Sequence, residues 1–363
     1  MTASATPARH YRVGQRGAGM VETMVGILIG MLVVLVIYNV FSVSEQHRRT
    51  TTGVADAQVS GLIAQFTLLR EFTSAGNGVS SALKNLALCA DTTLHPIPVL
   101  VTDGGATNVL NPASDTFVVF YSAPGRVVSP VNVVGATAVG SAFHAQSPNG
   151  FAAAYCSAAK PCLVIAMEAN HCDLRTATSV DAGGGIAELT VSPAASAAFS
   201  ADAKVINLGQ NGVATRTRYD VDTPNRVMRS QDLITQPGPN PVVPVASNVY
   251  LVKVQYGVDN VGDEQVHCWT TATNGACGDY SQPTVSGMNA DQLSRIRAVR
   301  FGIVVLSDEY DRDYVAPTTY LFNCSLDTDA DCQGRLQVKL PDNFRARMYE
   351  TIVPLRNAIW NAP

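Results

Sequence analysis

The first strong pattern along the chain is an apolar segment without a charged residue, from Thr23 to Ser44, bounded by Glu22 and Glu45. About 20 apolar residues are enough for a helix to cross the hydrocarbon core of a membrane. A cleavable secretory signal normally has an apolar core of only ~7–15 residues, followed by a small-residue cleavage site. The length of the segment therefore predicts a retained transmembrane helix over residues 18–44.

A second helical pattern follows the polar stretch 46–53. Apolar residues recur at helical spacing at Val59, Leu62, Ile63, Phe66, Leu69 and Phe72. We therefore expect an amphipathic helix over residues 45–76 that continues the first helix and packs on a globular head. Residues 74–78 contain the glycines that end it. Two separate helices, broken near Thr50 to Gly53, remain the alternative.

From about residue 77 the pattern changes to short apolar runs between clusters of Gly, Pro, Asn and Asp. Runs rich in Val, Ile, Tyr and Phe predict strands at residues 116–122, 162–167, 186–191, 204–208, 249–256, 296–306 and 347–353. Residues 236–241 are expected to form a surface loop, and residues 289–294 a short turn or helix. The fold expected is α+β: a long N-terminal helix packed on a mostly antiparallel β-sheet head over residues 77–363, built as one domain or two lobes.

Charge sets the expected topology and excludes one class of function. Charged residues make up 15% of the chain, against ~25% in an average soluble protein, and the net charge is −4. No run rich in Lys or Arg is present, which argues against nucleic-acid binding. Arg9, Arg12 and Arg16 precede the apolar segment without any acidic residue. Positive flanks stay in the cytoplasm, so we expect a single-pass protein of the inner membrane with a periplasmic head.

The residues around the start of the apolar segment, QRGAGMVETMV at 15–25, resemble the class III signal of type IV prepilins and pseudopilins. The resemblance implies that a prepilin peptidase cuts between Gly17 and Ala18, removes a leader over residues 1–17 and methylates the new amine. Ala18 departs from the family, which usually has Phe at that position. Glu22 would be the fifth residue of the mature chain and would pair with the N-terminal ammonium of a neighbouring subunit. Alternatively, Glu22 is an acid at a helix start, favoured there by the helix dipole.

Three segments nearer the C-terminus resemble the PilW family of minor pilins: VYLVKVQYGVD at 249–259, IRAVRFGIVVLS at 296–307 and YETIVPLRN at 349–357. The resemblance implies a structural subunit, not an enzyme, in a minor-pilin complex that primes pilus assembly at or near the pilus tip. It further implies roles in adhesion and twitching motility. Implied partners are other minor pilins, the major pilin and a PilY-type tip adhesin at the cell surface. A type II secretion pseudopilin of the GspJ kind and a membrane-anchored periplasmic enzyme or binding protein remain the alternatives.

Eight cysteines in an exported head predict disulfides. Two pairs are close in sequence, Cys268 with Cys277 and Cys324 with Cys332. For the other four we favour Cys156 with Cys162 and Cys89 with Cys172, although three pairings of four cysteines are open.

No motif for metal binding or catalysis is evident. His171 and His267 each precede a cysteine, but neighbours on a strand point to opposite faces, and no CxxC or HExxH motif occurs. Residues 259–264 are rich in oxygen ligands and are either a hairpin turn, the interpretation we favour, or a calcium site. The glycine-rich residues 181–185 lack the GK[ST] of a P-loop, and no GxSxG is present. We therefore expect no metal, no cofactor and no catalytic residues.

Overall fold

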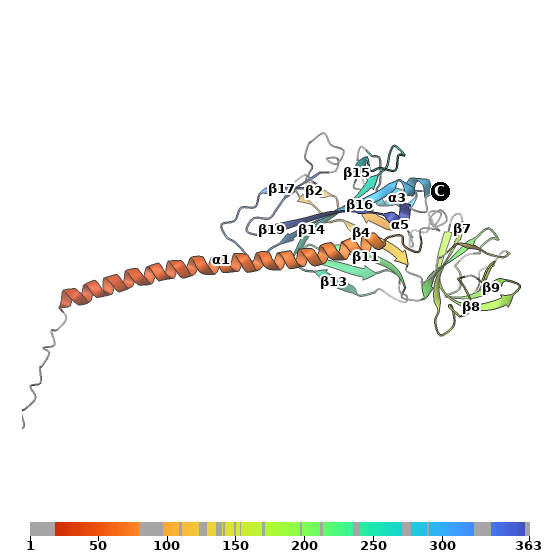
Figure 1. Ribbon diagram of the computed structural model, residues 1–363, viewed down its shortest axis with the longest axis horizontal. Coiled ribbons are helices and arrows are strands. Elements are labelled where there is room, and N and C mark those ends of the chain that lie inside the picture. Colours follow the sequence, from red (N-terminus) through yellow and green to blue (C-terminus); the bar gives the residue numbers. More distant parts are fainter. Residues whose placement is uncertain are drawn as a thin grey trace, which may run out of the picture. The chain divides into compact units, whose positions relative to one another are not determined.

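The computed structural model describes residues 19–79, 97–108, 111–122, 129–135, 140, 142–148, 150–152, 154–168, 171–196, 198–210, 213–234, 240–270, 277–288, 290–322 and 335–359. By its internal contacts the chain divides into two compact units, Met1–Thr52 and Gly53–Pro363. Helix α1 (Met20–Ser74) begins in the first unit and ends in the second (Figure 1). The predicted leader and Ala18 lie outside the described residues.

The first part of α1 has no buried face. Over Met20–Glu45 the mean hydropathy is 2.6, and none of this stretch is buried. A helix that is apolar all round is normally buried in a large core or in a membrane. Length and composition are therefore sufficient for this stretch to cross a membrane.

The second unit contains three main sheets and two short hairpins. The five-stranded sheet has the order β1 (Val99–Thr102), β4 (Thr116–Ser122), β11 (Ala214–Asp222), β12 (Val227–Asp232), β13 (Val242–Ala246). The four-stranded sheet has the order β15 (Cys268–Thr270), β14 (Val249–Val258), β16 (Ile296–Leu306), β19 (Ala346–Pro354). The six-stranded sheet has the order β5 (Val131–Asn132), β10 (Lys204–Gln210), β7 (Cys162–Glu168), β8 (His171–Gly183), β9 (Ile186–Ser192), β6 (Ala142–Ala145). The hairpins pair β17 (Thr318–Leu321) with β18 (Leu336–Lys339) and β2 (Ala106–Asn108) with β3 (Asn111–Pro112).

Three short helices, α3 (Gln282–Ser286), α4 (Ala290–Ser294) and α5 (Arg356–Ile359), complete the described elements. All the strand pairs of the described residues are antiparallel. The predicted α+β class is therefore confirmed. Each of the seven predicted strands is present, and β4 and β16 have the predicted bounds.

The main core lies between the second part of α1 and two of the sheets. Phe72 on α1 is fully buried, with its ring centroid 5.3 Å from that of Phe117 on β4 and 5.5 Å from that of Phe301 on β16. One residue of the helix thus packs against both the five-stranded and the four-stranded sheet. In Figure 1 this part of α1 runs along β13 and β19.

Small residues bring α1 close to the sheets. Ala57 and Ala64 are buried, and a Cβ at Gly61 would overlap the ring of Tyr349 on β19. Hydrogen bonds fix the same interface: Gln65 Nε2 donates to Thr351 Oγ1 at 2.8 Å, and the Tyr349 hydroxyl donates to the backbone oxygen of Gln58 at 3.2 Å.

The large apolar residues from which we predicted the packing face of this helix mostly point away from the sheets. Five of them are between 38% and 68% exposed, and we call these five residues the outer stripe: Val59, Leu62, Ile63, Phe66 and Leu69. Only Phe72 of the predicted set is buried. The prediction of that face was wrong: the face that packs on the sheets carries the small residues Ala57, Gly61 and Ala64 and then the large residues Leu68 and Phe72.

The six-stranded sheet carries a second core, which includes Phe143, Val164 and Phe199. A third cluster, with Phe120 on β4, Ile165 on β7 and Ile206 on β10, joins this sheet to the five-stranded sheet. The head therefore contains separate hydrophobic clusters that are linked through β4.

Candidate functional site

The predicted assembly residue Glu22 lies in the first turn of α1 and is exposed. Its backbone N–H donates to the Gly19 oxygen at 2.8 Å, so the helical hydrogen bonds begin there. A carboxylate at a helix N-terminus is stabilised by the helix dipole. In apolar surroundings, however, it would need a cationic partner. Gly17 and Ala18 lie outside the described residues.

The outer stripe is the second candidate contact surface. It runs along α1 on the side away from the sheets, and its side chains follow the i, i+3, i+4, i+7 positions of one helix face. Soluble monomers rarely expose contiguous apolar patches without using them as contact surfaces. A helix face of this kind can bind the apolar face of another helix.

Two of the predicted disulfides are present in the described residues. Cys156 is bonded to Cys162 with a Cα–Cα distance of 5.1 Å, and Cys268 to Cys277 with a Cα–Cα distance of 5.8 Å. Cys172 is also disulfide-bonded. Its expected partner Cys89 and the predicted pair Cys324 and Cys332 lie outside the described residues.

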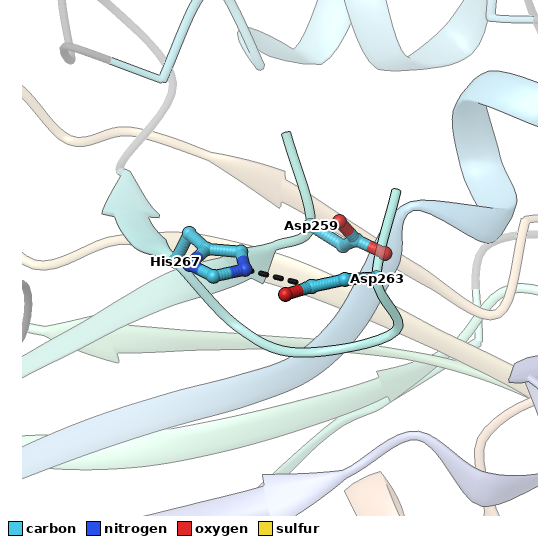
Figure 2. A group of neighbouring side chains, drawn as sticks. All are labelled: Asp259, Asp263 and His267. Atoms are coloured by element: carbon cyan, nitrogen blue, oxygen red, sulfur yellow. Dashed lines mark hydrogen bonds and ion pairs between the residues drawn. The ribbon is translucent and has the colours of Figure 1, made fainter. Parts of the chain in front are cut away.

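The oxygen-rich segment 259–264 is the turn of the β14–β15 hairpin (Figure 2). The fully buried Asp259 carboxylate accepts hydrogen bonds from the backbone N–H groups of Val261, Gly262 and Glu264, and from Arg297. Burial alone would raise the pKa of Asp259, but these donors more than offset it, so its pKa is lowered.

Asp263 and His267 complete a group whose potential ligand atoms lie within 4.8 Å of one another. Nε2 of His267 lies 2.7 Å from Oδ1 of Asp263. The Asp259 oxygens are engaged by the N–H groups of the loop, and so they organise this turn. The segment therefore forms the hairpin turn that the sequence analysis favoured.

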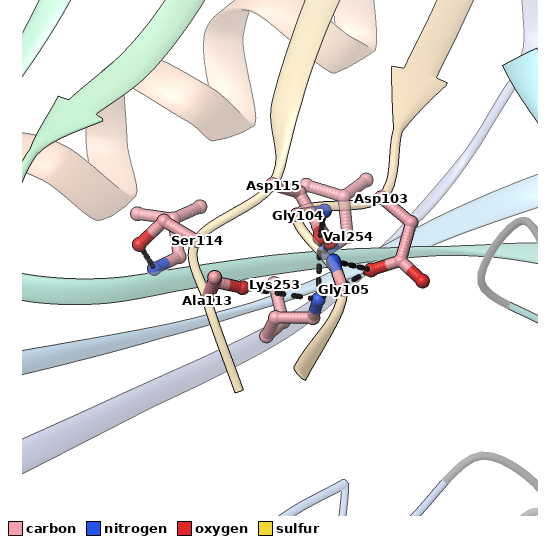
Figure 3. A network of polar contacts seen from close by, with 9 residues as sticks. Asp103, Gly104, Gly105, Ala113, Ser114, Asp115, Lys253 and Val254 are labelled. Atoms are coloured by element: carbon pink, nitrogen blue, oxygen red, sulfur yellow. Dashed lines mark hydrogen bonds and ion pairs between the residues drawn. The ribbon is translucent and has the colours of Figure 1, made fainter. Parts of the chain in front are cut away.

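A buried charge cluster, absent from the sequence predictions, lies between β14 and the segment before β4 (Figure 3). The Lys253 side chain is 2% exposed and that of Asp115 is fully buried. Lys253 Nζ donates to the near carboxylate oxygen of Asp115, to Asp103 Oδ1 at 2.8 Å and to the Ala113 oxygen at 3.2 Å. The three donors of the ammonium group are thus matched by three acceptors.

The Asp115 carboxylate is held from two sides by the backbone. Oδ1 accepts from the Gly104 N–H at 3.0 Å and Oδ2 from the Val254 N–H at 2.8 Å. Gly104 has to be glycine here, because a Cβ would overlap the carbonyl oxygen of Ser114. The carboxylate therefore sits in a fixed position beside the amine.

The electrostatics of this cluster follow from its burial. Burial raises the pKa of Asp115 to about 6, although Lys253 opposes the shift. Burial lowers the pKa of Lys253, but the two carboxylates more than offset this and raise it. A lysine within an apolar strand pattern, VYLVKVQYGV, is the sequence signal that could have revealed the cluster.

Comparison with known proteins finds a family resemblance over part of the chain. Residues 212–357 match the model of the PilW family, described as type IV pilus-assembly protein W. Among solved structures, a type IV-like pilin from Thermus thermophilus is similar, with 14% sequence identity, a TM-score of 0.27, and coverage of 55% of this chain and 84% of that chain. No match was found among curated proteins. The match includes the three segments that resemble minor pilins, so the resemblance to the PilW family of type IV pilus-assembly proteins is confirmed over residues 212–357.

Proposed function

We propose that this protein is a minor type IV pilin, a structural subunit of the pilus and not an enzyme. The observation that carries the proposal is the combination, in one chain, of a PilW-family match over residues 212–357 with an exposed apolar helix at Met20–Glu45. The finer proposals are that it joins a minor-pilin complex priming assembly, at or near the tip below a PilY-type adhesin, and supports adhesion and twitching motility.

The proposed path begins in the inner membrane. Residues 18–44 would cross it once, with the arginine-flanked N-terminus in the cytoplasm and the head over residues 77–363 in the periplasm. The prepilin peptidase would then remove residues 1–17 and methylate Ala18. The amphipathic residues 45–76 would connect the membrane helix to the head.

Assembly would then use the two exposed parts of α1. In the filament, Met20–Glu45 would exchange lipid contacts for contacts with helices of the major pilin and other minor pilins. The outer stripe, which lies in the second unit, would bind the same class of helix. Glu22 would pair with the N-terminal ammonium of a neighbouring subunit and fix the axial register.

The first test is processing. Gly17→Val is expected to block cleavage, because the peptidase site needs a residue without side-chain bulk before the scissile bond. N-terminal sequencing of the wild-type protein should begin Ala18-Gly19-Met20, and deletion of the prepilin peptidase should abolish this product. A mature N-terminus after residue 40 would contradict the proposal and favour an ordinary signal peptide. Recovery of the processed protein in a secretion pseudopilus, and not in pili, would favour the GspJ-like alternative.

The second test concerns Glu22. Glu22→Gln and Glu22→Lys should both reach the membrane, because the apolar segment alone supplies insertion. We expect Glu22→Lys to reduce the amount in sheared pili more than Glu22→Gln, since lysine adds repulsion against the neighbouring ammonium in a low dielectric. The measurement is the ratio of each variant in sheared pili to that in membranes. Wild-type ratios for both variants would show that Glu22 acts only as a helix-start acid.

A further inference from the structure

The Lys253 cluster brings together the groups that amide formation requires. A primary amine is in hydrogen-bond contact with a carboxyl group, and both are almost fully buried. A second carboxylate, Asp103, lies 2.8 Å from the same amine and is 21% exposed. We propose that Lys253 and Asp115 react within the folded chain to form an intramolecular amide cross-link, with Asp103 as the proton carrier. This proposal does not depend on the proposed pilin function.

The position of Asp115 suits the role of electrophile. The N–H groups of Gly104 and Val254 point at its two oxygens, at 3.0 Å and 2.8 Å. Backbone donors fixed in this way stabilise the negative charge that develops on a carboxyl oxygen when a nucleophile attacks its carbon. A nucleophile held in contact with its target also replaces an encounter in solution, which can raise the effective concentration to about 10⁵–10⁸ M.

Burial favours the product over the ion pair. Two charges held away from water each carry a desolvation penalty that a neutral product does not carry. A neutral amide removes both charges, and its one carbonyl oxygen keeps the backbone hydrogen bond from Gly104 or from Val254, whichever donates to the oxygen that stays. Asp103, whose side chain is 21% exposed, is the residue through which the cluster contacts solvent.

The atoms balance without an added reagent. The Lys253 ammonium passes one proton to the Asp115 carboxylate, which leaves a neutral amine beside a carboxylic acid. The amine lone pair attacks Cγ of Asp115, forming the C–N bond. Asp103 takes a proton from the nitrogen and returns it to the departing hydroxyl, so the C–O bond breaks and water leaves. The amide nitrogen keeps one of the three ammonium protons, and Asp103 ends as a carboxylate.

The cross-link would join two sheets covalently. Asp115 directly precedes β4 of the five-stranded sheet, and Lys253 lies within β14 of the four-stranded sheet. The two residues are 138 positions apart in the sequence. An amide here would hold the sheets together under conditions that break every hydrogen bond between them.

The decisive test is mass spectrometry of the wild-type protein, with its N-terminus determined and its disulfides reduced and blocked. We expect an intact mass one water molecule lower than the mass calculated for that N-terminus and the blocked cysteines, together with a branched proteolytic peptide that joins Lys253 to Asp115. An unmodified mass, with Lys253 and Asp115 in separate linear peptides, would overturn the proposal. Cyclisation at Asp103–Gly104 also releases one water but gives no branched peptide, so that result would overturn it as well.

Two variants test the assigned roles. Lys253→Arg keeps the positive charge but should retain the full mass, because the guanidinium group does not form this amide. Asp103→Asn leaves the amine and Asp115 in place but removes the proton carrier, so we expect most of the protein to remain unmodified. Complete cross-linking of Asp103→Asn would overturn the role of Asp103. The wild-type measurement decides the cross-link itself even if a variant does not fold.

Discussion

Replacing Phe72 by alanine is expected to lower the free energy of unfolding of the second unit by about 3–5 kcal/mol, the usual cost of deleting a large aromatic side chain from a core. The ring is fully buried and contacts Phe117 and Phe301, so its loss would leave a cavity between the helix and two sheets. Urea denaturation of the full chain in detergent, followed by the fluorescence of the buried Trp269, measures the change.

Phe66→Ala is the matched control, with the same substitution on the same helix. Phe66 is 68% exposed, so we expect its free energy of unfolding to change by no more than about 0.5 kcal/mol. The amount of this variant in sheared pili should nevertheless fall, because the outer stripe loses its largest side chain. Equal destabilisation by the two substitutions would contradict the observed orientation of α1.

Relative to protein that holds Lys253 and Asp115 as an ion pair without the amide, Lys253→Met is expected to be less stable by about 3–5 kcal/mol at pH 8, because it leaves the buried Asp115 charge without a partner. Burial already raises the pKa of Asp115 to about 6 with Lys253 present, and loss of the cation would raise it further. A carboxyl whose pKa is higher in the folded than in the unfolded state binds its proton more tightly when folded. The stability of the variant should therefore increase as the pH falls from 8 towards ~4, the ordinary aspartate pKa.

The double variant Lys253→Met with Asp115→Asn provides the control. It carries no ionisable group at residue 115, so its stability at pH 8 should exceed that of Lys253→Met. It should also lack the gain in stability at lower pH. Denaturation curves at pH 8 and pH 5 for the three proteins give this comparison. A deficit in Lys253→Met that is independent of pH would contradict the account of a buried, unpaired carboxylate.

The sequence alone was sufficient to predict an element when the composition of that element shows what surrounds it. The apolar stretch of α1 needs no tertiary partner to be recognised, because its length and lack of charge match the thickness of a membrane. β16 was predicted with its observed bounds because nearly every position of the strand is buried, and such strands are continuous runs of Val, Ile and Leu.

Two of the strands that the sequence analysis missed have polar partners across the sheet. β11 and β12 were not predicted, and they pair through charged residues such as Arg229 and Asp220, 2.8 Å apart. Each strand alone has the composition of a loop. The favourable pairing exists only once the register places opposite charges across from each other.

Sequence by itself determined an apolar helix long enough to cross a membrane, and a β-rich head in which residues 212–357 resemble the PilW family. Tertiary structure alone decided which face of the helix is buried, because large apolar residues occur on both faces, as Phe66 and Phe72 do, and only packing on the sheets distinguishes them. Tertiary structure also decided how the charge of Lys253 is stabilised. Whether a charge within an apolar strand is tolerated depends on its partners, and the topology supplies Asp115 and Asp103 from a distant part of the chain.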